Sequence, residues 1–128
     1  MSMSEAPIYS LRLENRGNYL FAHVQAEHID LEIARGYLGE VAAACRALEC
    51  TRVLIVRDIP QVFGDAGQFS ISQEATELFK GIKICWVNPY LENQSSLAFA
   101  TTVATNRGGR FGMFSNEAEA EEWLLAGL

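Results

Sequence analysis

The chain has 128 residues and a mass of 14.2 kDa, which is the size of a single domain. Hydrophobic residues make up 49% of it and charged residues 20%, a balance typical of compact globular domains rather than disordered chains. The net charge of -6 disfavours nucleic-acid binding, because phosphate backbones are held by clustered Lys and Arg side chains. No apolar run reaches the roughly 18–20 residues of a transmembrane helix, so we expect no membrane partner.

The beginning of the chain and its cysteines predict a compartment. Residues 1–5 (MSMSE) have neither the basic region nor the apolar stretch of a secretory signal peptide. Three cysteines, an odd number, suggest reduced thiols rather than a disulfide framework. We therefore expect a cytoplasmic protein with one domain over residues 1–128, in which residues 1–7 form a flexible N-terminus.

The first elements are predicted to be a β-hairpin followed by an amphipathic helix. Residues 9–14 alternate between apolar and polar side chains, residues 15–18 supply turn residues, and residues 19–25 form a second strand. Asp30 is a suitable N-cap for the helix that follows. The apolar stripe of this helix has members at alternating steps of three and four: Leu31, Ala34, Leu38, Val41, Cys45 and Leu48.

Strands and helices alternate in the rest of the chain. Residues 53–56 (VLIV) predict a strand covered on both faces, and Pro60 ends it. A loop is expected over residues 61–69, after which Ser70 and Gln73 form a capping box. This second helix is expected to bury Ile71, Ala75, Leu78 and Ile82.

Two more strands and two more helices complete the prediction. Residues 82–87 and 110–114 are expected to be strands, and residues 92–106 a helix. Asn116 and Glu119 fit a capping box for the last helix. The result is an α/β fold of order ββαβαβαβα, with helices packed on a mixed sheet.

Catalytic and metal-binding signatures are absent from the sequence. It has no P-loop, dinucleotide fingerprint, nucleophile elbow, HExxH or CxxC motif. Cys45 and Cys50 are five residues apart on a predicted helix and Cys85 is on a buried strand, so all three are expected to be packing residues. His23 and His28 lack neighbouring ligands. We expect no metal, no cofactor and no enzymatic activity, although dispersed catalytic residues would escape this test.

Asp58, at the end of a central strand, resembles the phospho-acceptor of response-regulator receiver domains. Those domains also need an acidic pair after the first strand and a lysine after the last, and neither is present. Asp58 is therefore expected to make turn or cap hydrogen bonds. The loop over residues 64–67 (GDAG) could present backbone N–H groups to an anion, but an ordinary loop with a Ser70 cap is the simpler interpretation.

The whole layout from Tyr9 onward resembles the STAS-like superfamily, in particular its SpoIIAA-like branch, bacterial relatives of anti-sigma-factor antagonists. Three segments carry the resemblance: YLFAHV (residues 19–24), RVLIVRD (residues 52–58) and FSNEAEAEEWL (residues 114–124).

The resemblance implies a non-enzymatic regulatory module that binds a protein partner, either a kinase or an anti-sigma factor. Antagonists of this superfamily are switched by phosphorylation of a serine at the start of the helix after the third strand. The comparable residues here have Ala66 in place of a hydroxyl, so Ser70 and Ser72 are the candidate phosphorylation sites. The expected partner surface extends over residues 61–72 and the helix that follows, with Asp65, Gln68, Ser70, Ser72 and Glu74. Bulky charges at Asp65 and Gln68 are expected to weaken partner capture without unfolding the domain.

The alternative function is a carrier or sensor of a small apolar ligand, because the SpoIIAA-like fold resembles CRAL-TRIO lipid-transfer domains. The candidate pocket walls are aromatic: Phe63, Phe69, Phe79, Trp86 and Tyr90. The simpler interpretation places them in the ordinary core, since aromatic residues dominate cores. The sequence leaves a homodimer open.

Overall fold

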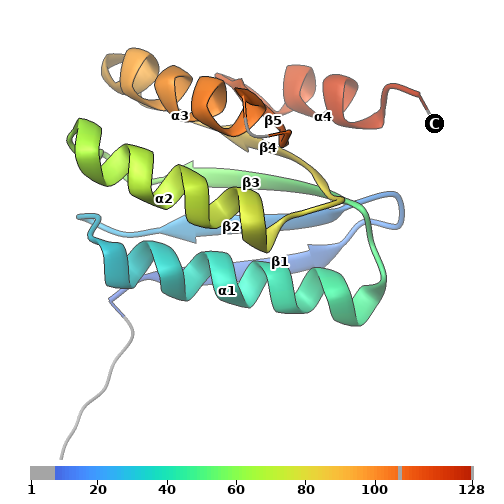
Figure 1. Cartoon of the computed structure of the whole chain (residues 1–128). Coiled ribbons are helices and arrows are strands. Elements are labelled where there is room, and N and C mark those ends of the chain that lie inside the picture. The colour runs from blue at the N-terminus through green and yellow to red at the C-terminus, as the bar shows by residue number, and fades with distance from the viewer. Residues whose placement is uncertain (1–7, 107, 128) are drawn as a thin grey trace, which may run out of the picture.

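The computed structural model describes residues 8–106 and 108–127, and the expected flexible stretch 1–7 lies outside them. Within these residues, five strands and four α-helices alternate after an opening hairpin, with a short 3-10 turn before the third helix (Figure 1). The elements are β1 (Ser10–Asn15), β2 (Leu20–Gln25), α1 (Leu31–Leu48), β3 (Arg52–Asp58), α2 (Asp65–Leu78), β4 (Lys83–Val87), η1 (Leu91–Asn93), α3 (Gln94–Asn106), β5 (Arg110–Phe114) and α4 (Glu117–Leu125).

The strands form one mixed sheet in the order β1-β2-β3-β4-β5. β1 and β2 pair antiparallel, and all later neighbours are parallel, with Leu20 opposite Val53 and Val53 opposite Ile84. This confirms the predicted fold class and element order. It also follows from the connections, because parallel neighbours need a crossover and each crossover here contains a helix.

Alternation along the strands divides the core between the two faces of the sheet. Val53 and Ile55 of β3 point to the face that α1, α2 and α3 cover, whereas Leu54 and Val56 point to the face against which α4 packs. Both faces of β3 are therefore buried, as its unbroken apolar run predicts.

Two of the predicted helix caps are confirmed. Asp30 Oδ1 accepts a hydrogen bond of 2.8 Å from the Ile33 N–H, and Asn116 Oδ1 accepts one of 2.9 Å from the Glu119 N–H. α1 ends at Leu48, and Glu49 follows with a left-handed φ of 55°. Leu48, the last residue of the helix, is 44% exposed, so its assignment to the buried stripe is wrong.

The predicted start of α2 is wrong by six residues, because the N-cap is Gly64 and not Ser70. The helix begins at Asp65 with Gly64 as N-cap, and the Gln68 N–H donates to the Gly64 carbonyl at 2.9 Å. Gly67 lies inside the first turn, where the Phe63 ring packs against it and a Cβ would lie 3.0 Å from the ring. Ser70 is therefore an interior helix residue and not a cap. At the other end, Ile82 is buried but lies after the helix.

The three cysteines carry free thiols, and two of them belong to the core. Cys50 follows the end of α1, which corrects its placement on the helix, and the Cys45 thiol donates to its carbonyl at 3.0 Å. Burial is the largest cause that raises the pKa of Cys45 and of Cys85, each to about 12.

Alkylation of the native protein is expected to modify Cys50 alone. At pH 8 a thiol with a pKa near 12 is ionised in only about one molecule in ten thousand, and the thiolate is the nucleophile. Iodoacetamide followed by intact-mass measurement should therefore give one adduct per folded chain and three in denaturant. Rapid triple labelling without denaturant would contradict the buried positions of Cys45 and Cys85.

No helix in the described parts of the chain is long and apolar enough to cross a membrane.

Candidate functional site

The predicted partner residues do not share one surface, because α2 turns some of them outward and others inward. Asp65 is exposed and Ser70 is half-buried. Glu74 accepts two hydrogen bonds of 2.8 Å from the Arg35 guanidinium of α1. These hydrogen bonds are the main cause that lowers the pKa of Glu74. The pair therefore holds the outer edges of α1 and α2 together.

Gln68 and Ser72 lie on the inner side of α2, and their assignment to a partner surface is wrong. Gln68 is 6% exposed and Ser72 is 4% exposed. The Ser72 hydroxyl donates to the Gln68 carbonyl at 2.7 Å, which satisfies it within the helix. A partner or a kinase acting on the folded domain cannot reach either side chain.

Ser70 occupies a different position from the one expected for a phosphorylated serine. We expected it at the helix N-terminus, where unpaired backbone N–H groups would stabilise a phosphate. It is instead the sixth residue of α2, beyond the first turn in which those groups occur. The first turn contains Asp65, Ala66 and Gly67, none of which has a hydroxyl.

An internal cavity of about 50 Å³ lies between the sheet and α1, α2 and α3. Its apolar wall includes Phe63 and Trp86, two of the five aromatic residues proposed from the sequence. Trp86 packs against Phe111, with ring centroids 5.1 Å apart. The structure therefore brings part of the predicted pocket together under α2.

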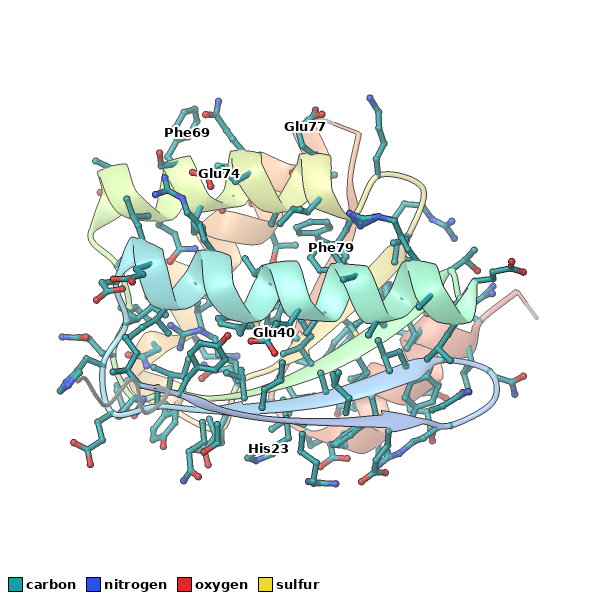
Figure 2. All side chains as sticks on the ribbon, turned by 90° about the horizontal axis from the view of Figure 1, so that it is seen from below. His23, Glu40, Phe69, Glu74, Glu77 and Phe79 are labelled. Carbon is teal, nitrogen blue, oxygen red and sulfur yellow. The ribbon has the colours of Figure 1, made fainter. Side chains whose placement is uncertain are left out.

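The other three aromatic residues do not line this cavity. Phe69 is 41% exposed, and Figure 2 shows it projecting from α2 away from the core. Phe79 follows the last residue of α2 and is fully enclosed in the core, where it points back between α2 and α1 (Figure 2). Tyr90 lines a separate surface groove. Their assignment to one pocket is wrong, because the outward and inward faces of α2 and the loop after β4 lie in different directions.

The cavity has a polar end that the sequence analysis missed. Arg57 of β3 is only 4% exposed, because it points to the same face as Val53 and Ile55. Its Nη1 donates to the Ile59 carbonyl at 2.9 Å and its Nη2 donates to the Gln61 carbonyl at 2.8 Å. Among the described residues no carboxylate lies within 4 Å of this guanidinium.

Gln68 also lines this end of the cavity, and its Oε1 is buried without a hydrogen-bond partner among the described residues. Burial is the largest cause that lowers the pKa of Arg57. A charged residue within an apolar strand run was the available signal for this site, since alternation from Val53 turns position 57 toward the helices.

The surface groove lies at the carboxyl ends of β2 and β3, where Gln25 and Asp58 are paired. The Tyr90 hydroxyl donates to Asp58 Oδ1 at 2.7 Å, and this hydrogen bond is the main cause that raises the pKa of Tyr90. The Nε2 atom of His23 lies 3.9 Å from Asp58 Oδ2. Asp58 therefore contacts side chains across the groove, in place of the turn or cap hydrogen bonds that we expected. No group of three metal-ligating side chains occurs in residues 8–106 and 108–127.

Comparisons with known proteins give matches among solved structures. No family model matches the sequence, and no curated protein is significantly similar to it. An anti-sigma factor antagonist from Mycobacterium paratuberculosis matches with a TM-score of 0.64 and 15% identity, over 95% of this chain and 98% of that chain.

Two further structures extend the comparison. The anti-sigma factor antagonist SpoIIAA in its unphosphorylated form has a TM-score of 0.56 and 12% identity, over 93% of this chain and 100% of that chain. An uncharacterised protein of the DUF3478 family with a SpoIIAA-like fold, from Shewanella loihica PV-4, has a TM-score of 0.57 and 16% identity. The match covers 97% of this chain and 99% of that chain. The chain therefore has a SpoIIAA-like fold, as its sequence pattern predicts.

Proposed function

We propose that this domain is a non-enzymatic regulatory module that binds a protein partner of the kinase or anti-sigma-factor type through the outer face of α2. The observation that carries the proposal is the fold shared with two structures described as anti-sigma factor antagonists. Its free thiols fit a reducing compartment, so we place it in the cytoplasm.

The outer stripe of α2 supplies the surface. Asp65, Phe69, Gln73 and Glu77 follow one another at steps of four, which aligns them along one side of the helix. Phe69 and Glu77 project from the same side of α2 in Figure 2. Phe69 is 41% exposed and lies between the carboxylates of Asp65 and Glu77. This arrangement is suited to a partner that has an apolar pocket with a basic rim.

Control by phosphorylation is restricted to Ser70 on this surface. Ser72 is enclosed, and Ala66 stands in the first turn. A phosphate on Ser70 would add negative charge beside an acidic stripe and so change the charge match with a basic rim of the partner.

Reversal of charge at Asp65 is expected to reduce partner capture by about tenfold, because hot-spot contacts at the centre of an interface have effects of this size. The test compares wild-type and Asp65→Arg proteins as bait in a native lysate, with quantitative mass spectrometry of the captured proteins. Glu122→Arg, the same charge reversal on the exposed side of α4, is the control and should capture as wild type does. Equal capture by Asp65→Arg and wild type would exclude this surface.

A second candidate function, a carrier or sensor of a small ligand, is favoured by the cavity beside Phe63 and Trp86. Its volume of about 50 Å³ is well below the approximately 150 Å³ of a cavity that accepts benzene. A long lipid chain would require α2 to move away from the sheet. Native mass spectrometry of protein purified without refolding, repeated after denaturation, tests this function. A bound small molecule that is lost on denaturation would support the carrier function, and the mass of the protein alone in both spectra would count against it.

A further inference from the structure

The polar end of the cavity combines an unpaired acceptor with a buried cation. Gln68 is only 6% exposed, and its Oε1 lacks a hydrogen-bond partner among the described residues. A buried polar atom of this kind is uncommon in folded proteins and indicates that another molecule supplies the missing bond. Arg57 lines the same cavity.

Arg57 retains both charge and hydrogen-bonding capacity for such a molecule. Arg57 donates one N–H from each terminal nitrogen to the carbonyls of Ile59 and Gln61 and also interacts with the Tyr37 hydroxyl, whereas a guanidinium has five N–H donors. The two carbonyls contribute dipoles but no full negative charge. Because a buried cation is stabilised most by an anion, the charge at this end of the cavity is complementary to a carboxylate.

We propose that the cavity binds a short monocarboxylic acid, whose carboxyl group contacts Arg57 and Gln68 and whose apolar part packs against Phe63 and Trp86. This inference rests on the second candidate function, the carrier or sensor. It does not depend on the partner surface of α2.

A carboxyl group satisfies both residues in either protonation state. A carboxylate accepts from Arg57 with one oxygen, and it accepts from the Gln68 NH2 with the other once the amide turns over. A protonated acid donates its O–H to Gln68 Oε1 and accepts from Arg57 with its carbonyl oxygen. The cavity volume of about 50 Å³ restricts the apolar part to a short chain.

The two tryptophans of the chain make the test direct. Trp86 lines the cavity, whereas Trp123 packs beside Phe114 on the opposite face of the sheet, with ring centroids 5.7 Å apart. Their two indole N–H signals in a ¹H–¹⁵N NMR spectrum, assigned with Trp123→Phe, therefore report on the cavity and on a control site. The probe is acetate, with acetamide and ethanol as neutral compounds of similar size, because the volume of about 50 Å³ is too small for a longer acid.

Acetate is expected to shift the Trp86 signal saturably and to leave the Trp123 signal in place. Acetamide and ethanol should bind about tenfold more weakly, since they lack the charge that pairs with Arg57. Gln68→Leu should weaken acetate binding by about fivefold, since it removes one polar contact. Gln73→Leu, a change on the outer stripe of the same helix, should leave the binding of the acid unchanged.

Three results would overturn the proposal: no saturable shift with acetate, equal binding of the neutral compounds, or unchanged binding in Gln68→Leu. The first would mean that ordered water fills the polar end of the cavity. Equal binding of the neutral compounds would exclude the acid and leave the carrier function standing. Native mass spectrometry tests the carrier function separately, because it does not depend on the chemical class of the ligand.

Discussion

Replacement of Gln68 by lysine is expected to destabilise the domain by about 3 kcal/mol, because it places an ammonium group in a site with almost no access to water. The Gln68 side chain is 6% exposed and lines the cavity that also contains the Arg57 guanidinium. The lysine must therefore lose its proton, remain charged beside a second cation, or displace the helix. Urea unfolding followed by circular dichroism measures the loss as a change in free energy of unfolding.

Three further variants separate charge from size. Gln68→Glu should lose less stability than Gln68→Lys, because a carboxylate can pair with Arg57. Gln68→Leu should be near neutral, because it removes the unpaired Oε1 together with the amide. Gln73→Lys, on the outer side of α2, should stay within about 0.5 kcal/mol of wild type. If Gln68→Lys were as stable as Gln73→Lys, the inner side of α2 would have to be open to water.

The sequence predicted instead that a charge at Gln68 would leave the domain folded. The difference arises because α2 begins earlier than predicted, which changes the direction in which Gln68 points. A helix predicted to have Ser70 as its N-cap leaves residues 61–69 in an exposed loop, where a charged side chain would not destabilise the fold. The actual start at Asp65 gives residues 65–69 fixed directions, so that Gln68 points inward and Phe69 points outward. The local pattern from Ser70 to Gln73 fits a capping box, but tertiary packing overrides such local signals, and the helix runs through both residues.

The sheet and its order could be predicted because their signals are local and repeated. The alternating residues 9–14 and the unbroken run 53–56 each define a strand by side-chain pattern alone. Parallel neighbours follow from the helices between the strands. The candidate site is different, because Arg57, Phe63 and Trp86 come from three separate segments. Which of these side chains share a cavity is determined by tertiary packing, and a single sequence contains no pattern that reports it.

Arg57 illustrates why the polar end of the cavity was missed. Charged residues in strands usually face water, and arginine is rarely fully buried without a partner. Alternation from Val53 and Ile55 gives the correct face, but only the helices above that face show that it is closed to solvent. The carbonyls of Ile59 and Gln61, which the chain presents immediately after the strand, make this burial possible.

Truncation of Leu124 to alanine is expected to cost about 3 kcal/mol, because Leu→Ala changes in enclosed sites lose both burial and packing. Leu124 is fully buried, and it belongs to the cluster in which α4 covers Phe21 and Leu54 of the sheet. The C-terminal turn of α4 is also attached to the sheet. Lys83 Nζ donates to the Trp123 carbonyl at 2.7 Å, and Arg52 Nε donates to the Leu124 carbonyl at 3.0 Å.

Leu48→Ala is the matched control, since Leu48 is the same residue type at a helix end but is 44% exposed. It should change the free energy of unfolding by no more than about 0.5 kcal/mol. Equal urea midpoints for the two variants would mean that α4 contributes little to the folded domain. A cooperative loss of about 3 kcal/mol in Leu124→Ala alone would show that the second face of the sheet is part of the same core, because a peripheral helix could separate without lowering the stability of the remainder.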